Sequence, residues 1–212
     1  SFWLQILKQI ALGLGKEAIT ECNLLVKRMI GQVAGGVVLD IPAGTGLFTF
    51  DEYVKHPGIT FIAAEYSRGM LEKAREKAAE LKAKNIILVR ADVGRLPFKD
   101  DCFDAVLCLN GIHSFPEKNR SIRQMSRVLK KNKKIFGTLI LGGERRLTDL
   151  VLKAAYFRLK WFMPPALTCG ELVALLESHG LRICDKKILK AALAFEAEKI
   201  TAPDASLQFP PA

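Results

Sequence analysis

The chain has 212 residues, of which 50% are hydrophobic and 25% are charged, and its 32 Lys and Arg against 22 Asp and Glu give a formal net charge of +10. Its five cysteines are odd in number and lack any C-x-x-C spacing, which argues against a disulfide framework and a zinc site and favours a reducing, cytoplasmic compartment. No apolar run reaches the roughly 18 residues that a membrane-spanning helix needs.

The residue pattern of the first part of the chain predicts a helix. Residues 2–32 have an apolar, helical pattern that breaks near residues 13–15. We expect residues 1–35 to form an N-terminal helical lid that packs on the domain. The apolar opening is interrupted by Lys8 and has no clear small-residue cleavage site, so a signal peptide is disfavoured.

From residue 37 onward, strand patterns alternate with helix patterns. Such alternation indicates βαβ units and a largely parallel sheet. The last two strands are joined by a short connection and are expected to pair antiparallel. We predict strands at 37–39, 60–64, 86–90, 103–109 and 135–141 with two more within 182–200, and helices at 47–54, 70–82, 120–129, 145–162 and 170–179.

The predicted fold class is therefore α/β, with a mostly parallel seven-stranded sheet flanked by helices and an antiparallel strand near the C-terminus. No segment within residues 37–200 has the composition of a linker, which predicts one domain over residues 1–200. The residues after Thr201 are rich in Pro and Ala, so 201–212 are expected to be a loose tail.

The most informative stretch joins the first strand to a glycine turn. The strand ends in Asp40, and Gly44 and Gly46 follow at once. A turn of this kind lets a ligand approach bare backbone at the carboxyl end of a parallel strand. A carboxylate there would repel a pyrophosphate and pair with an ammonium group. S-adenosylmethionine carries such an ammonium, whereas NAD does not.

Three further strand ends carry polar side chains. Glu65 follows the second strand, 19 residues after Gly46, and an acid at this place can accept both hydroxyls of a ribose. Asp92 follows the third strand and can accept from an adenine amino group, with Val93 beside the ring. Residues 110–113, Asn-Gly-Ile-His, follow the fourth strand. Their joint placement predicts an adenosine-type ligand.

With these motifs the chain resembles the class I S-adenosylmethionine-dependent methyltransferases. The resembling group includes the menaquinone and ubiquinone C-methyltransferases and many small-molecule methyltransferases. The resemblance runs in register over about residues 36–141. It rests on residues 38–46 (VLDIPAGTG), 64–75 (AEYSRGMLEKAR), 90–98 (RADVGRLPF), 103–106 (FDAV) and 127–130 (RVLK).

The resemblance implies a Rossmann-like fold, S-adenosylmethionine as the cofactor and no metal. By it, Asp40 and the glycine turn hold the methionine end and Glu65 binds the ribose. Tyr66 and Met70 then flank the adenosine. The implied cofactor-binding residues are Asp40, Pro42, Ala43, Gly44, Thr45, Gly46, Glu65, Tyr66, Met70, Asp92, Val93, Leu109 and Asn110.

Two positions depart from the family pattern. Pro42 stands where the family usually has glycine, so the turn must accept a negative φ there and the cofactor must not need that N–H. Residues 130–134 read Lys-Lys-Asn-Lys-Lys, where the family commonly has a Pro-Gly-Gly turn before the fifth strand. Asn132 is expected to supply a left-handed backbone conformation.

A methyl sulfonium is a strong electrophile, so an enzyme need only hold the acceptor in line with it. A base is required only when the acceptor must lose a proton. His113 is the candidate for that base, because a histidine titrates near neutrality. The alternative is that His113 only caps or lines the wall of the pocket.

The acceptor is expected to bind next to residues 142–168, a helical insertion on the acceptor side that is both basic and apolar. We expect a small, lipophilic acceptor, with S-adenosylhomocysteine as the second product. Peripheral contact with an anionic membrane stays open. A helix of this kind can also simply pack on the domain.

Other functions are weighed against this one. The charge of +10 motivates an RNA methyltransferase, although no added RNA-binding module or series of stacking aromatic residues supports nucleic acid as a partner. A noncatalytic protein that binds S-adenosylmethionine is a further alternative. A nicotinamide dehydrogenase is disfavoured, because Thr49 occupies the third glycine position and Asp40 faces the pyrophosphate site.

Overall fold

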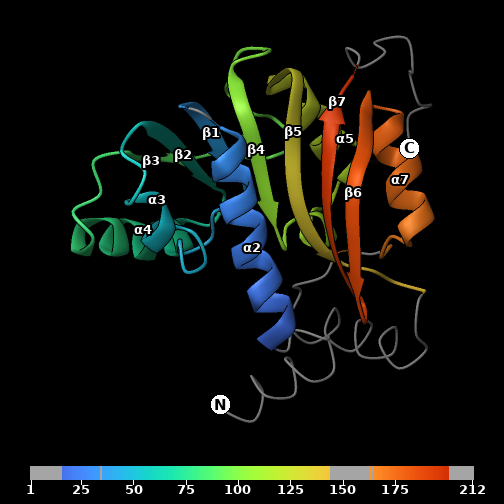
Figure 1. Ribbon diagram of the computed structural model, residues 1–212, viewed down its shortest axis with the longest axis horizontal. Helices are drawn as coiled ribbons and strands as arrows, with labels where there is room; N and C mark the ends of the chain where they lie inside the picture. The colour runs from blue at the N-terminus through green and yellow to red at the C-terminus, as the bar shows by residue number, and fades with distance from the viewer. Residues whose placement is uncertain (1–15, 34, 144–162, 164, 201–212) are drawn as a thin grey trace.

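The computed structural model describes residues 16–33, 35–143, 163 and 165–200 (Figure 1). Helices and strands alternate through most of this range, as the sequence predicts. The helices are α2 (Lys16–Gln32), α3 (Phe50–Tyr53), α4 (Arg68–Glu80), α5 (Lys118–Val128) and α7 (Cys169–Glu177), with a short 3-10 turn at Ile112–Ser114.

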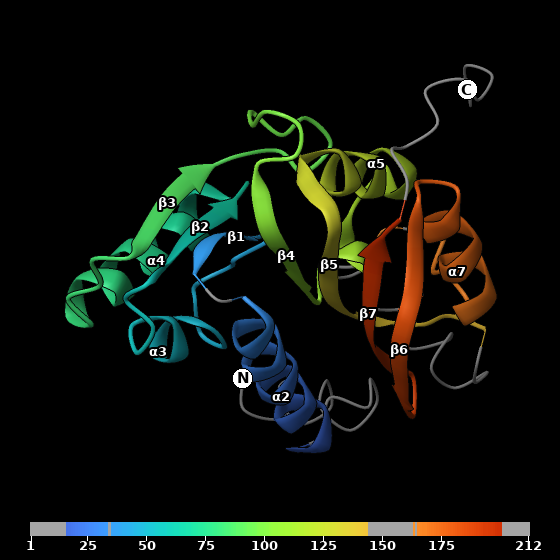
Figure 2. The same cartoon turned by 45° about the horizontal axis from the view of Figure 1, so that its top comes forward.

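The strands form one sheet with the order β3-β2-β1-β4-β5-β7-β6. β1 to β5 are parallel, whereas β7 pairs antiparallel with both β5 and β6. Figure 2 shows β6 and β7 at one end of the sheet, with α7 beside them. This arrangement confirms the predicted fold class. The strands are β1 (Gly36–Asp40), β2 (Ile59–Glu65), β3 (Ile86–Arg90), β4 (Phe103–Leu109), β5 (Leu129–Ile140), β6 (Leu181–Leu189) and β7 (Ala192–Lys199).

The strand order reverses between β1 and β4. The chain runs outward from β1 through β2 to β3 and then returns to lay β4 on the other side of β1. At such a switch point the loops after the two central strands diverge, which opens a crevice outside their carboxyl ends. Ligands of open α/β sheets bind in this crevice, so the topology itself selects the edge where the site lies.

Each face of the sheet carries its own apolar cluster. On one face α2 lies across the central strands, as Figure 1 shows, and its Leu25 and Met29 are fully buried there. On this side Tyr53 stacks on Phe61, with ring centroids 3.6 Å apart. The other face is covered by α5 and α7, which bury Ile122 and Leu172 among others. Because both faces are covered, the central strands are continuous apolar runs.

Two elements begin more than two residues away from the predicted position. β5 begins at Leu129, six residues before the expected start, so the run of lysines lies inside a strand instead of a turn. Asn132 has the expected left-handed backbone, with φ of 60°, where the pairing of β4 with β5 shifts register. α3 begins at Phe50, because the glycine turn continues through residue 49 and leaves the side chain of Leu47 exposed.

Three predicted segments fall wholly or largely outside the described residues. They are the first part of the N-terminal lid (1–15), most of the acceptor-side insertion (144–162 and 164) and the tail (201–212). The single domain over residues 1–200 therefore stays a prediction. In the part of the chain that the structure describes, no helix has both the length and the apolar character needed to cross a membrane.

β5 and β7 approach closely at Gly137, and a substitution there tests how tightly the two strands pack. A Cβ added at Gly137 would lie 2.5 Å from two ring carbons of Phe195, and that ring is buried with no room to move. We expect Gly137→Ala to lower the free energy of unfolding by roughly 1–3 kcal/mol, which urea titration would measure.

Gly31, in the last turn of α2, is the matched control for this test. A Cβ added there meets nothing within 4 Å. Alanine restricts the unfolded chain and favours helix, so Gly31→Ala should raise the free energy of unfolding by about 0.5–1 kcal/mol. Equal effects of the two substitutions would show that the contact between residues 137 and 195 does not govern packing here.

Candidate functional site

The polar residues predicted at the strand ends come together at one edge of the sheet. In the parallel register Asp40 lies opposite Ala63 of β2 and Leu107 of β4, and Glu65 lies opposite Arg90 of β3. The loops that follow these strands therefore leave from the same side, at the lower end of β4 in Figure 1. This is the edge that the strand order selects for a ligand.

The glycine turn after β1 is tied to β2 by a backbone hydrogen bond, and part of its backbone is open to a ligand. The N–H of Ala43 donates to the carbonyl of Ala64 at 2.9 Å, which ties the turn to the end of β2. Gly44 and Gly46 have φ of 58° and 70°, where glycine is favoured. A Cβ at Gly46 would strike the ring of Phe50, whereas one at Gly44 would meet nothing within 4 Å. The backbone at residue 44 is thus accessible to a ligand.

The residues around these glycines belong to the same turn. Pro42 follows a cis peptide bond. Ala43 and Thr45 are half-buried, so the turn lies at the surface of the crevice. The N–H of Gly46 donates back to the carbonyl of Ala43 at 3.0 Å.

Asp40 is almost completely buried beneath this turn, with 1% of its surface exposed. Its Oδ2 accepts hydrogen bonds from the hydroxyls of Thr49 and Tyr53, both at 3.1 Å. Burial raises the pKa of Asp40 to about 7, because the two hydrogen bonds offset only part of the cost of removing a charge from water. The carboxyl group therefore fixes the start of α3 and is only partly ionised at neutral pH.

Glu65 joins the glycine turn to the beginning of α4. One carboxylate oxygen accepts from the N–H of Gly44 at 3.0 Å and the other from the N–H of Ser67 at 2.8 Å. Ser67 in turn caps α4, as predicted, by accepting from the N–H of Met70. Each carboxylate oxygen has a second lone pair, so Glu65 can accept two more hydrogen bonds from a ligand diol without giving up these contacts.

Two large side chains stand beside Glu65 in solvent. Tyr66 is 67% exposed and Met70 is 46% exposed. The guanidinium of Arg90 lies 5.9 Å from the centre of the Tyr66 ring, and its Nε donates to the Tyr66 carbonyl at 3.3 Å. Such exposed apolar surface beside a carboxylate suits the flat face of an adenosine.

The turn after β3 is closed by a hydrogen bond between the side chain of Asp92 and the backbone two residues further along. Asp92 is exposed, and its Oδ1 accepts from the N–H of Gly94 at 2.8 Å. Val93 is buried under the turn. The carboxylate of Asp92 is therefore held at the rim of the crevice, where a ligand amino group can reach it.

At the end of β4 the chain turns sharply at Asn110. Leu109 is buried, and Asn110 has a left-handed backbone with φ of 53°. The N–H of Asn110 donates to both the carbonyl and the hydroxyl of Thr138 on β5, and the Thr138 hydroxyl donates to Asn110 Oδ1 at 3.3 Å. Sequence reasoning missed Thr138, although a lone hydroxyl within the apolar run of β5 was an available signal.

The side chain of His113 is more buried than is expected of a general base. It is 8% exposed, and its Nδ1 accepts a hydrogen bond from the N–H of Ile140 at 3.2 Å. Burial, assisted by the nearby charge of Lys118, lowers the pKa of His113 to about 3. An efficient base needs an available lone pair and a pKa near the working pH. This geometry argues against the predicted catalytic role and favours the alternative, a wall residue.

Substitution of His113 separates these two roles. If His113 only pins the loop to β5, His113→Asn should keep the acceptor for Ile140 and retain methyl-transfer turnover within about threefold. His113→Ala should instead lower the free energy of unfolding by roughly 1–3 kcal/mol, because it leaves a buried N–H without a partner. Loss of turnover in a stably folded His113→Asn protein, with unchanged cofactor affinity, would restore the catalytic role.

Comparison with known proteins gives the same class that the fold and the site suggest. A family described as a methyltransferase domain matches residues 38–132, which span the glycine turn, the three further strand ends and α5. A demethylmenaquinone methyltransferase of Clavibacter sepedonicus is 37% identical over 131 residues. This match covers 60% of the chain and 52% of the relative, so the chain spans about half the length of that protein.

Solved structures share the fold at low sequence identity. The YcgJ protein of Bacillus subtilis has a TM-score of 0.72 and 19% identity, covering 85% of this chain and 98% of that one. The [4+2]-cyclase SpnF has a TM-score of 0.71 and 17% identity, with 87% and 82% coverage. These likenesses show the fold alone, and the second shows that the fold also serves other chemistry.

The domain match thus places a methyltransferase domain at residues 38–132, and the fold of the chain is one that solved S-adenosylmethionine-dependent methyltransferases share. The site is consistent with that cofactor. It offers an open glycine backbone at residue 44, a carboxylate with unused acceptor capacity at Glu65, and exposed apolar side chains beside it. Among the described residues, no cluster of three or more His, Cys, Asp or Glu side chains could hold a metal ion.

Proposed function

We propose that the protein transfers a methyl group from S-adenosylmethionine to a small, lipophilic acceptor and releases S-adenosylhomocysteine. The observation that carries the proposal is Glu65, whose two oxygens join the glycine turn to α4 and keep lone pairs for a ribose diol. In this proposal Asp40 attracts the ammonium of the methionine moiety, Asp92 and Val93 address adenine, and Leu109 and Asn110 lie beside the sulfonium.

When bound, the cofactor supplies a methyl group on an electrophilic sulfonium. The residues of the chain contribute position rather than proton transfer. Glu65 and the glycine turn fix the ribose and the methionine end, so the methyl group points to one place in the crevice. Orientation of this kind can supply most of the rate enhancement of a bimolecular transfer. His113 does not take part in this mechanism and only supports the loop after β4.

A lipophilic acceptor is supported by the surface next to the glycine turn. Leu47 and Phe48 follow Gly46 directly and are 66% and 39% exposed. They line a groove of about 300 Å³ between α2 and the start of α3, together with Asn23, Val26, Lys27, Asp51 and Glu52. The Clavibacter relative is named for a demethylated quinone, a substrate of this chemical type. We propose that residues 142–168 complete the acceptor side.

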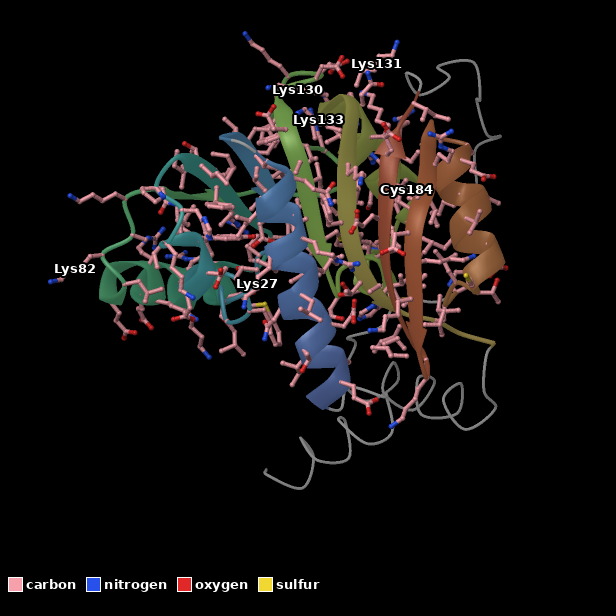
Figure 3. The ribbon with its side chains drawn as sticks, in the orientation of Figure 1. Lys27, Lys82, Lys130, Lys131, Lys133 and Cys184 are labelled. Atoms are coloured by element: carbon pink, nitrogen blue, oxygen red, sulfur yellow. The ribbon has the colours of Figure 1, made fainter. Side chains whose placement is uncertain are left out.

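The distribution of charge favours this acceptor over RNA. Lys130, Lys131 and Lys133 lie near the end of the sheet where β4 and β5 begin (Figure 3). This end is opposite the carboxyl ends where the cofactor is proposed to bind. Lys130 also pairs with Asp104 at 2.8 Å. The lysine run therefore does not line the proposed reaction site. A steep salt dependence of RNA affinity would instead favour the RNA alternative.

The cysteines support a reducing, cytoplasmic compartment, which is also part of the proposal. All five lie within the described residues and none is in a disulfide bond. Secreted domains with several cysteines usually pair them. Measurement of five reactive thiols in the denatured protein isolated without reductant would agree with this location.

Transfer of a labelled methyl group tests the proposed activity. The protein is incubated with labelled S-adenosylmethionine and either a demethylated isoprenoid quinol or total RNA. We expect label in the quinol fraction only. Label in RNA would support the alternative acceptor, and cofactor binding without transfer to either class would support a noncatalytic role.

A further inference from the structure

The positive charge of the chain is concentrated in one stretch. Residues 90–134 contain eleven Lys and Arg residues against five Asp and Glu residues, so they supply +6 of the formal net charge of +10. This stretch comprises the loop between β3 and β4, strand β4, helix α5 and the start of β5. A local excess of this size marks a surface that attracts anionic partners.

The loop between β3 and β4 runs along α5, so the two form one continuous surface. The Leu96 N–H donates to the side-chain oxygen of Gln124 at 3.3 Å, and the guanidinium of Arg127 donates to the Leu96 carbonyl at 3.0 Å. Further along, the Cys102 N–H donates to the carbonyl of Val128 at 2.9 Å. The loop therefore follows the helix to its end, where β5 begins.

Four exposed basic side chains of this surface have no counter-charge. We call the surface the basic face, and its four members, which form no ion pair within the described residues, are Arg95, Lys99, Arg123 and Lys131. Four of the five acids in the stretch pair with other cations, in the couples Asp100–Arg127, Asp101–Lys199, Asp104–Lys130 and Glu117–Arg120. The fifth, Asp92, accepts the N–H of Gly94. The positive charge of the basic face is therefore largely uncompensated.

The basic face reaches from the rim of the proposed cofactor crevice to the opposite edge of the sheet. Gly94 lies in the turn that holds Asp92 at the rim, and a Cβ added there would lie 3.6 Å from Cδ of Arg120, in the first turn of α5. Lys131 lies at the other end, where β4 and β5 begin (Figure 3). A partner that covers this face therefore also comes up to the crevice.

The side chains of the basic face distinguish between kinds of anionic partner. Single-stranded nucleic acid is usually held by exposed aromatic rings on which its bases stack. The large aromatic side chains that are exposed in the described part of the chain, Phe48 and Tyr66, lie outside this face. Separate Lys and Arg side chains without such rings instead suit the phosphate headgroups of a bilayer, to which each of them is attracted individually.

We propose that the basic face docks the protein on a membrane surface that carries anionic phospholipids. The choice of partner rests on the proposed function, because a small, lipophilic acceptor dissolves in the bilayer and the face borders the crevice. Docking brings the rim of the crevice to the place where such an acceptor is concentrated. The attraction to the headgroups is electrostatic, so it weakens as added salt screens it.

Vesicle binding tests the inference without any measurement of methyl transfer. Sedimentation compares vesicles of phosphatidylcholine mixed with phosphatidylglycerol and vesicles of phosphatidylcholine alone. The test variant combines Arg123→Gln with Lys131→Gln. The matched control combines Lys82→Gln with Lys84→Gln, which removes the same charge from two exposed lysines that have no ion-pair partner among the described residues. These lysines follow α4, which packs on the other face of the sheet through Ala74.

We expect the wild type to bind the vesicles that contain phosphatidylglycerol, to bind them less as salt is added, and to leave phosphatidylcholine vesicles unbound. Each basic side chain at an anionic surface contributes about fivefold, so Arg123→Gln with Lys131→Gln should weaken binding about 25-fold. The control variant should lose less than about threefold, because its charges lie outside the contact. Calorimetry should give the same affinity for S-adenosylhomocysteine in all three proteins.

Equal weakening by the two double variants would overturn the inference, because binding would then follow net charge and not this face. Unchanged binding by Arg123→Gln with Lys131→Gln would assign the contact to another surface. A wild type that binds neither kind of vesicle, or both alike, would also contradict the proposal. Tighter binding to total RNA than to the anionic vesicles, lost in the same variant, would make nucleic acid the partner. If the wild type binds anionic vesicles but not S-adenosylhomocysteine, the docking surface stands and the proposed function is wrong.

Discussion

Replacement of Glu65 by alanine is expected to weaken the binding of S-adenosylhomocysteine by roughly 1–3 kcal/mol, which is about 5- to 150-fold in affinity. In the proposed binding mode, the substitution removes the acceptor for the ribose diol. It also removes the partners of the Gly44 and Ser67 N–H groups, so the glycine turn loses its tie to α4. The first loss acts on the ribose and the second on the turn proposed to hold the methionine end.

Two further variants make the Glu65 result interpretable. Glu65→Gln keeps the shape but replaces one acceptor oxygen by a donor, which faces an N–H, so it should lose most of the same affinity. Glu72→Ala removes an exposed carboxylate on α4, the helix that follows Glu65, where it pairs with Arg68 at 3.1 Å, and this variant should bind normally. Calorimetric affinities that are unchanged in Glu65→Ala would remove this residue from the site.

The second large effect concerns Asp40 and depends on pH. Its pKa is about 7 in the folded protein, above the ordinary value of 3.8. The folded state therefore holds this proton more tightly than the unfolded chain does. The carboxyl group contributes stability that is full below about pH 4 and is lost as the pH rises through 7. The ionised form is nevertheless the one that attracts an ammonium group.

As the pH rises, the contribution of Asp40 to the free energy of unfolding should therefore fall while the affinity for the ligand rises. We expect wild-type affinity for S-adenosylhomocysteine to rise between pH 6 and 8, roughly tenfold, as Asp40 ionises. Asp40→Asn should bind weakly at every pH in this range. At pH 8 the same variant should unfold at a higher urea concentration than the wild type, because it no longer buries a charge.

Asp51 supplies the control for the Asp40 experiment. It lies on α3, but it is exposed and pairs with Lys77, which holds its pKa below the ordinary value. Asp51→Asn should leave both the pH dependence of binding and its magnitude unchanged. A wild-type affinity that does not vary between pH 6 and 8 would contradict the assignment of the ammonium to Asp40.

The fold followed closely from local patterns. β3 and β4 have the predicted bounds, because each is an apolar run with turn signals on both sides. The start of β5 was missed because residues 130–134 are polar. These residues extend the ladder beyond the buried part of the sheet, where no apolar alternation marks a strand. The short α3 was overextended, because the glycine turn occupies its expected first turn.

The sequence indicated where the candidate site residues lie along the strands but not the environment of their side chains, and their roles in binding stay a prediction. Asp40, Glu65, Asp92 and Asn110 end parallel strands, and such ends must meet at one edge of the sheet. Their partners come from elsewhere in the chain. The hydroxyls of Thr49, which precedes α3, and Tyr53, at the end of α3, for example, donate to Asp40. The depth of a side chain is likewise set by the assembled fold.

His113 illustrates this difference. Its place after β4 suggested a base, whereas its burial against the N–H of Ile140 favours the alternative, a wall residue. The pairing depends on Ile140 at the end of β5, which lies 27 residues further along the chain. No pattern within residues 110–113 could have revealed it.

Calorimetric titration with S-adenosylhomocysteine, with NADH as the matched control, tests whether this crevice binds S-adenosylmethionine. Both ligands carry an adenosine, but only the first has an amino-acid end and lacks a pyrophosphate. We expect S-adenosylhomocysteine to bind at a single site and NADH neither to bind nor to compete. Failure of S-adenosylhomocysteine to bind, or its displacement by NADH, would contradict the assignment of this crevice to S-adenosylmethionine.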